Sequence, residues 1–210
     1  DPPRGYAISL LLHLGLTAAA TYAFARRAMR LGQPGACLAA LAFTFGGFLT
    51  GQSGHLNQVQ ATAWLPVVLL LADEALQPGR RWWCVPTGVA LGVQLLAGHA
   101  QETYMTGVAM GLLALYRCWQ PRRMGQAAPG APAASAKEPL ARFPTEGLVA
   151  RLLGSALALG VAAGVAAGLA AVQLVPTLEL AGLSIRGGGL DFREATAFSL
   201  PPTLALRGLM

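Results

Sequence analysis

The chain has 210 residues, of which 54% are hydrophobic and only 11% are charged. Soluble domains average about 25% charged residues, and the mean hydropathy here is +0.51. These values exclude a disordered chain, a collagen-like chain and a disulfide scaffold, and the three cysteines are too few and too scattered for a zinc site. The net charge of +6 does not indicate a nucleic-acid partner, because the basic residues form short clusters between apolar blocks.

The hydrophobic residues gather in six blocks, and a membrane-spanning helix needs roughly 20 such residues. The blocks run from about Tyr6 to Phe24, Pro34 to Leu49, Val59 to Leu76, Trp82 to Ala97, Thr103 to Tyr116 and Leu152 to Val175. The first, third and sixth blocks have the required length, whereas the other three are short enough to be buried or re-entrant helices. The sequence therefore predicts an all-α, polytopic membrane protein with about six transmembrane helices.

Basic residues between the blocks predict the orientation of the helices. Eleven of the fifteen lysines and arginines lie in the loops after the first, third and fifth blocks, which the positive-inside rule assigns to the cytoplasm. The expected bundle covers residues 1–176 and includes a low-complexity cytoplasmic linker at about 120–147. Residues 177–210 are expected to form an extracytoplasmic segment leading into a missing C-terminal part, because a chain that begins with Asp1 is interpreted as a piece of a longer protein.

Small residues in the sixth block indicate how its helix packs. Gly160, Gly164 and Gly168 recur at four-residue spacing among alanines, which predicts a face for close helix packing. Pro176 is expected to end or bend this helix.

Two acidic residues, Asp73 and Glu74, end the third block. We expect them to lie at the cytoplasmic edge, where water and the nearby Arg80 and Arg81 satisfy them.

Two polar segments, Gly51–Gln60 and Gly98–Tyr104, follow the second and fourth blocks, and the expected topology puts both at the outer boundary of the membrane. Both contain the pattern Gly-His-x-(Asn/Gln)-(Gln/Glu), and in a helix His99 and Glu102 would share a face. Such side chains can hold hydroxyls or a phosphate, and histidine can transfer protons. The candidate substrate-binding residues in these segments are His55, Asn57, Gln60, His99, Gln101, Glu102 and Tyr104.

Two other interpretations of these segments stay open. The polar residues are also typical of ordinary loop ends that meet water and cap helices. A zinc site formed by His55, His99 and Glu102 is less favoured, because the paired spacing of an H-E-x-x-H motif is absent. We therefore predict no metal ligands, while the use of a divalent cation is left open.

A carboxylate and a guanidinium follow the sixth block, at Glu179 and Arg186. They can pair with each other or receive a charged head group, so both are candidate substrate-binding residues. We expect this pair and the two histidine-bearing turns to converge on a single cavity at the outer face.

Several of these motifs occur together in the order found in a known family. They are Phe43-x-Phe45-Gly46-Gly47-Phe48, Gly54-His55-x-Asn57, Trp64-Leu65-Pro66, Gly98-His99-x-Gln101-x-x-Tyr104, Pro176-x-x-Glu179 and Ser184-x-Arg186. In this order and spacing the chain resembles the YfhO-type bacterial membrane proteins, from near Leu10 to about Pro202.

That family is similar to the GT-C class of glycosyltransferases, which take a sugar from a polyprenyl-phosphate carrier. The resemblance implies a multi-pass enzyme of the bacterial cytoplasmic (inner) membrane that transfers a sugar to a cell-envelope polymer on the outer face. Its expected partners are the carrier lipid, membrane lipid and the polymer acceptor, with no nucleic acid.

In GT-C enzymes the catalytic carboxylate usually lies in the first outer loop, often within an acidic pair. Asp1 is the sole acid before the first block and no acidic pair is present there, so the resemblance implies a catalytic base upstream of this chain. The catalytic residue is therefore unknown, and Arg186 is expected to stabilise the departing lipid phosphate.

The sequence is also compatible with two other functions. A transporter or flippase for a lipid-linked or polar solute would also use intramembrane polar residues and a helix bent by proline. A non-catalytic membrane scaffold would use the glycine face of the sixth block as a docking surface.

Overall fold

The computed structural model describes residues 2–77, 79–119, 145–184, 189 and 191–196, and every regular element among them is helical. The elements are α1 (Pro2–Arg27), α2 (Gln33–Thr44), α3 (Gly47–Gly51), α4 (Leu56–Ala75), the 3₁₀ turn η1 (Arg81–Trp83), α5 (Cys84–Leu96), α6 (Ala100–Trp119), α7 (Thr145–Leu183) and α8 (Phe192–Ala195). The chain forms two compact units, residues 1–170 and 171–210. The boundary falls within α7, so the longer part of that helix belongs to the first unit.

Each of the six predicted blocks coincides with helical structure, and the all-α prediction is confirmed for the described residues. The second block is interrupted: α2 ends at Thr44 and the short α3 follows. A Cβ atom on Gly46 would lie 2.6 Å from the carbonyl oxygen of Ala42, so only glycine fits at this break. The sixth block lies within α7, which continues through Pro176 to Leu183, so the proline does not end the helix and the expected bend stays a prediction.

Three of the described helical stretches are long and apolar enough to cross a membrane, judged by length and composition. They are Arg4–Arg27, Gln33–Gly51 and Gly147–Leu183. Within the same described ranges α4, α5 and α6 are shorter or less apolar than this requires, and α5 has only 13 residues. The structure thus supports three candidate spans, and a total of about six stays a prediction.

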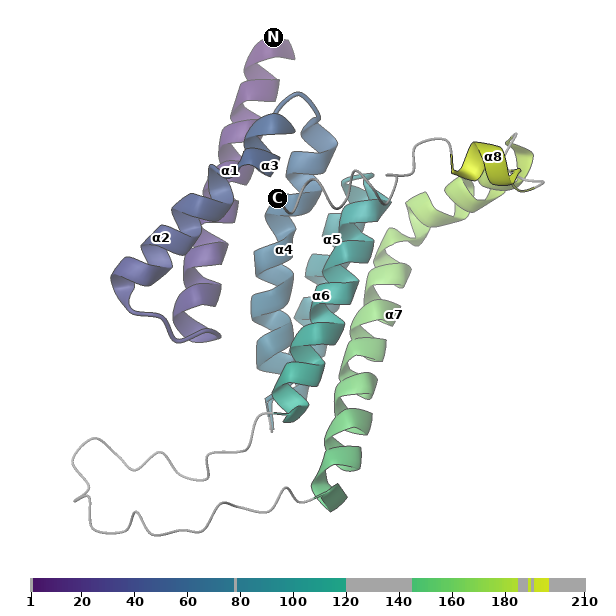
Figure 1. Ribbon diagram of the computed structural model, residues 1–210. Helices are drawn as coiled ribbons and strands as arrows, with labels where there is room; N and C mark the ends of the chain where they lie inside the picture. The colour runs from purple at the N-terminus through teal and green to yellow at the C-terminus, as the bar shows by residue number, and fades with distance from the viewer. Residues whose placement is uncertain (1, 78, 120–144, 185–188, 190, 197–210) are drawn as a thin grey trace, which may run out of the picture. The chain divides into compact units, whose positions relative to one another are not determined.

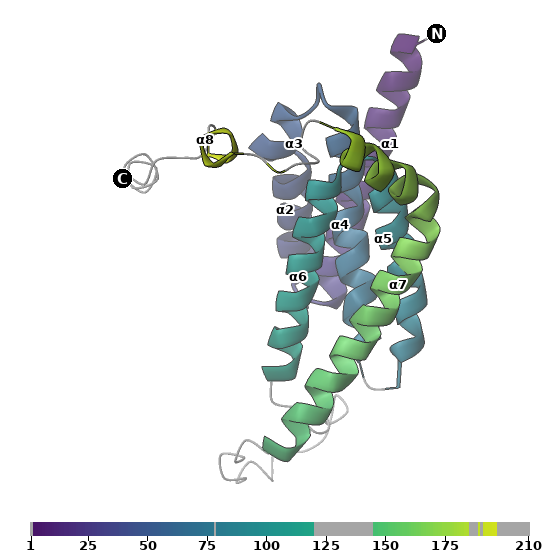
Figure 2. The ribbon, with the colours of Figure 1, turned by 90° about the vertical axis from the view of Figure 1, so that its right-hand side faces the viewer.

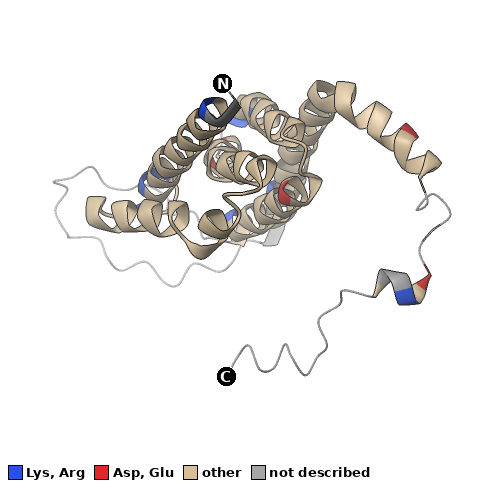
Figure 3. Ribbon diagram, turned by 90° about the horizontal axis from the view of Figure 1, so that it is seen from above, with Lys and Arg blue, Asp and Glu red and all other residues tan. Residues whose placement is uncertain are grey.

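Burial in the first unit differs from that of a typical soluble protein, in which large apolar side chains lie mostly inside. The fully buried side chains include Thr17, Thr87 and Gln94, whereas Leu12 is 67% and Leu38 is 69% exposed. Seen end-on in Figure 3, the helices of this unit also carry few charged residues. An apolar exterior around a small and polar interior is expected of helices that pack against lipid.

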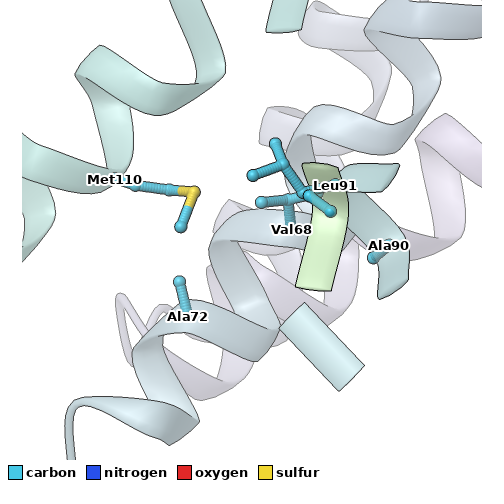
Figure 4. Packing of buried hydrophobic residues seen from close by; sticks show 6 residues of the cluster. Val68, Ala72, Ala90, Leu91 and Met110 are labelled. Carbon is cyan, nitrogen blue, oxygen red and sulfur yellow. The ribbon is translucent and has the colours of Figure 1, made fainter. Parts of the chain in front are cut away.

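Helix α4 lies in the middle of the first unit, where it packs against α1, α5 and α6 (Figures 1 and 2). The buried apolar cluster around it contains Val68 and Ala72 of α4, Ala90 and Leu91 of α5, Met110 of α6 and Ala166 of α7 (Figure 4). Most of these side chains are small or slender. The helices can therefore approach closely, and dispersion contacts replace the burial of large side chains.

Helix α5 approaches α7 most closely at two glycines. A Cβ atom on Gly88 would lie 2.5 Å from the carbonyl oxygen of Ala162 and 2.6 Å from Cβ of Val165. A Cβ atom on Gly92 would lie 2.9 Å from a methyl carbon of Leu169. We call this contact the α5–α7 seam. The close approach is possible because Gly88 and Gly92 of α5 have no side chains, and it does not depend on the glycines of α7.

The predicted packing face of α7 is wrong. Added Cβ atoms on Gly160, Gly164 and Gly168 would meet nothing within 4 Å. The buried row consists instead of the alanines Ala158, Ala162, Ala166 and Ala170. The two rows are offset by two residues, which is about 200° around an α-helix, so the glycines lie on the face away from the α5–α7 seam.

Replacing Gly88 with alanine is expected to destabilise the first unit by about 1–3 kcal/mol, because the added methyl group overpacks the α5–α7 seam. The measurement is thermal unfolding of the purified chain in detergent micelles, followed by helical circular dichroism. The matched control is Gly164→Ala, which should be neutral or stabilising because alanine favours helix over glycine by up to about 1 kcal/mol. Equal losses in the two variants would contradict the seam.

Candidate functional site

The direction of the helices brings the two polar segments together at one end of the first unit. Helices α4 and α6 run the same way and α5 returns between them, so both polar segments precede the start of a helix at the same end (Figures 1 and 2). Gly98 has a φ of +80°, a left-handed conformation that glycine adopts without strain. This turn lets α6 begin at Ala100, immediately after His99.

Three side chains meet there, and we call Gln58, His99 and Glu102 the polar trio. The amide nitrogen of Gln58 lies 2.9 Å from Nε2 of His99. Because an amide N–H can only donate, Nε2 accepts this hydrogen bond and the ring proton resides on Nδ1. That nitrogen lies 3.8 Å from Oε1 of Glu102, so the imidazole is oriented between an amide and a carboxylate.

The polar trio is largely enclosed and incompletely satisfied. The side chains of His99 and Glu102 are 20% and 14% exposed. Among the described residues, Oε1 of Gln58 and Nδ1 of His99 are buried without a hydrogen-bond partner. Buried polar atoms in native proteins usually have a partner, which can be water or a bound molecule. The trio therefore contains one buried acceptor and one buried donor without described partners, close to the Glu102 carboxylate.

A second set of hydrogen bonds continues from the polar trio into the bundle. The fully buried Gln94 donates from its amide nitrogen to the carbonyl oxygen of Ala61, at 2.9 Å, and to the hydroxyl of Thr106, at 2.8 Å. The Thr106 hydroxyl in turn donates to the carbonyl oxygen of Glu102 at 2.9 Å. These contacts join α4, α5 and α6 through polar groups and fix the start of α6 next to α4.

The other predicted residues of the two segments lie outside the trio. His55, Asn57, Gln101 and Tyr104 are exposed. Gln60 donates instead to the Ser9 hydroxyl of α1 at 3.1 Å. Gln60 therefore joins α4 to α1. The four exposed residues have no described polar contact with the trio.

Glu179 is exposed in the second unit, and Arg186 lies outside the described residues. The expected convergence of this pair with the histidine-bearing turns therefore stays a prediction.

Gln58 is not among the candidate residues predicted from the sequence. In the repeated pattern Gly-His-x-(Asn/Gln)-(Gln/Glu), Gln58 and Glu102 both occupy the last position. The structure brings these two last positions to the same histidine, His99. The repetition itself was therefore the signal that could have identified Gln58.

In the described part of the chain, no group of three or more histidine, cysteine, aspartate or glutamate side chains is placed to hold a metal ion. The alternative zinc set of His55, His99 and Glu102 is thus not assembled there.

The acidic residues at the far end of α4 differ from expectation. Glu74 pairs with Arg80 as expected. Asp73, however, is only 3% exposed and pairs with Arg117 of α6, with 2.5 Å between Oδ1 and Nε. Arg117 also donates to the carbonyl oxygen of Ala28 at 3.0 Å. The interpretation of Asp73 as a water-exposed interfacial residue is therefore wrong, because it forms a buried ion pair between two helices.

Comparisons with protein-family models, with curated proteins and with solved structures found no match. The resemblance to the YfhO-type proteins therefore rests on the motifs in the sequence.

The geometry of the polar trio can be tested with an engineered metal site. Gln58→His places a second imidazole beside His99 and Glu102, which gives three ligands of the kind that bind zinc. We expect Zn²⁺ to raise the melting temperature of this variant, because a ligand bound only by the folded state adds about 2.7 kcal/mol at 100 times its Kd. Asn57→His is the control, and a shift of the same size in both variants would argue against the trio.

The buried ion pair predicts a strong energetic coupling. Arg117→Leu should lower the free energy of unfolding by about 1–3 kcal/mol, because Asp73 loses its hydrogen-bonded cation while Arg27, Arg30 and Arg81, which line the same cavity, still offset part of its charge. The double variant Asp73→Leu/Arg117→Leu should be clearly more stable than this single variant, since it removes both charges. Chemical unfolding of the three chains measures the coupling. Losses that simply add would show that the two residues do not interact.

Proposed function

We propose that the chain is part of a GT-C-like glycosyltransferase of the bacterial inner membrane. It would move a sugar from a polyprenyl-phosphate carrier to a cell-envelope polymer on the outer face. The polar trio supports this proposal most directly, because it sets an oriented histidine and a half-enclosed carboxylate at one end of the helices. The basic loops lie at the other end, so the positive-inside rule assigns the trio to the outer face.

In this proposal Glu102, which the sequence marked only as a substrate-binding residue, accepts the proton of the acceptor hydroxyl in place of the upstream carboxylate that the family resemblance implies. The acceptor oxygen forms a bond to the anomeric carbon as the bond between that carbon and the phosphate oxygen breaks, and the lipid phosphate leaves with the electron pair. His99 lies beside the carboxylate, with Nδ1 3.8 Å from Oε1 of Glu102, and its Nδ1–H, which has no described hydrogen-bond partner, would donate to a sugar or acceptor hydroxyl that binds next to Glu102. Arg186 would stabilise the departing phosphate, since a guanidinium matches phosphate geometry.

The choice of Glu102 follows from where the carboxylates lie. In the described part of the first unit, Asp73 and Glu74 are at the opposite end of α4 and are paired with arginines. Glu102 is the described carboxylate beside an unsatisfied donor at the expected outer end. A general base must lie within reach of the proton that it removes, and Glu102 meets this requirement for a hydroxyl bound against His99.

A transporter is the second candidate, and Gln94 favours it. Its amide is fully buried in the bundle, with Oε1 unpartnered among the described residues. A polar group at such depth is typical of solute pathways in membrane proteins. The glycosyltransferase is preferred because His99 and Glu102 provide an ionisable pair for proton transfer, whereas Gln94 has no ionisable group.

The test is the variant Glu102→Gln, which keeps the shape of the side chain and removes its basicity. Transfer of sugar to the cell-envelope polymer, measured by glycan analysis in cells that carry the gene, should fall by about 100-fold or more, the usual contribution of a general base. Glu74→Gln makes the same chemical change at the other end of α4 and should leave transfer unchanged.

Normal glycan with Glu102→Gln at normal protein levels would overturn the assignment of Glu102. Solute uptake into proteoliposomes that is abolished by Gln94→Leu, without any transfer product, would establish the transporter instead.

A further inference from the structure

A cavity of about 530 Å³ opens at the end of the first unit opposite the polar trio. Its wall is formed by the ends of α1, α4 and α6, by η1 and by the first turns of α7. The charged residues that line this arginine cavity are Arg27, Arg30, Arg81, Arg117, Arg151 and Asp73. Counting the described residues alone, five arginines face one aspartate, which is an excess of four positive charges.

The arginines of this cavity have little negative charge to balance them. Asp73 is paired with Arg117. Arg151 donates to the carbonyl oxygens of Gly147 and Cys118 at 3.0 and 3.2 Å, and these neutral partners do not cancel its charge. Across the described ranges, Arg27, Arg30 and Arg81 have neither an ion pair nor a hydrogen bond from the guanidinium.

Two features hold the cavity in this form. Arg81 packs directly on the backbone of α7, since a Cβ atom on Gly154 would overlap its guanidinium. Arg30 has a φ of +58°, a left-handed conformation that an L side chain adopts only under some strain. Arginines from distant positions in the sequence thus line the same cavity.

Residues 120–144, which join α6 to α7, contain four basic residues and one acidic residue in sequence, so they add no net negative charge.

An apolar groove of about 430 Å³ adjoins the arginine cavity, and the side chain of Cys118 lines both. The groove lies between the end of α6 and the start of α7. Its other lining residues are Leu115, Tyr116, Trp119, Leu148 and Leu152. A basic cavity next to a groove of this kind matches a ligand with an anionic head and an apolar tail.

We propose that the arginine cavity binds the phosphate of an anionic phospholipid and that the adjoining groove binds one of its acyl chains. Guanidinium groups match phosphate oxygens in geometry and charge. Basic pockets between helices on the cytoplasmic side are suited to anionic head groups. This site is distinct from the polar trio and does not depend on the proposed transferase function, since the two lie at opposite ends of α4 and α6.

Native mass spectrometry of the full chain, released from micelles that contain defined lipids, tests the proposal. The wild-type chain should retain phosphatidylglycerol in preference to phosphatidylcholine. The variant Arg27→Gln/Arg81→Gln should lose this retention by roughly 30-fold, since each arginine near an anionic lipid contributes about 1 kcal/mol. The control Arg26→Gln/Arg80→Gln removes the same charge from the neighbouring residues, which do not line the cavity, and should retain the lipid.

The groove is tested in the same assay by Leu148→Ser/Leu152→Ser, with the adjacent exposed residues Val149→Ser/Leu153→Ser as the control. Loss of phosphatidylglycerol in the first pair but not in the second supports the acyl-chain site. Circular dichroism of each variant confirms that the helices are intact. If Arg27→Gln/Arg81→Gln has lost its helices, Arg27→Lys/Arg81→Lys takes its place and should show weakened retention.

Three results would overturn the proposal. The first is equal retention of phosphatidylglycerol by Arg27→Gln/Arg81→Gln and its control. The second is equal retention of phosphatidylglycerol and phosphatidylcholine by the wild-type chain. The third is displacement of the lipid by inorganic phosphate at the same concentration, which would show that the cavity takes a free anion and that the groove contributes nothing.

Discussion

The buried ion pair between Asp73 and Arg117 sets the register of α4 against α6. The two residues are 44 positions apart in the sequence, and Gln58 and Glu102 have the same separation. A shift of one helical turn would move α6 by about 5.4 Å and break the ion pair and hydrogen bond between Asp73 and Arg117, and a lost hydrogen bond to a charged group costs about 1.5–3 kcal/mol. The small apolar side chains between the helices carry no comparable penalty. The ion pair lies fifteen residues further along both helices, about 22 Å from the polar trio. By fixing the register of the two helices it places Gln58 next to the start of α6, where the trio forms.

This arrangement divides the polar chemistry of the first unit into two ends. One end holds an imidazole, a carboxylate and an amide with unsatisfied buried atoms. The other gathers arginines from four separate elements around one cavity. The apolar exterior between them is what a lipid environment requires, because many large apolar side chains, such as Leu12 and Leu38, are exposed while many buried positions are alanine or threonine. The two ends thus suit different ligands, a neutral hydroxyl compound at one and an anionic head group at the other.

The sequence predicted the helices well because long apolar blocks leave few alternatives to a helix. It also predicted the contact of His99 with Glu102, since residues three apart share a helical face. The sequence did not predict which side chains face a neighbouring helix, because this depends on how each helix is rotated about its axis. Asn57, Gln58 and Gln60 look equivalent in sequence, but each step along α4 turns the side chain by about 100°, and only Gln58 reaches His99. The pairing of Asp73 with Arg117 left no local signal, because register between distant helices is fixed by packing.

The most direct test of the two-ended arrangement is the labelling of single cysteines at the ends of α4 by a membrane-impermeant maleimide. The native Cys37, Cys84 and Cys118 would be replaced by alanine, and Gly54→Cys and Gln77→Cys introduced one at a time. The account predicts that intact cells are labelled at position 54, whereas position 77 reacts only after the membrane is opened. Labelling of both positions from the same side would contradict it, because α4 could then not place the polar trio and the arginine cavity on opposite faces of the membrane.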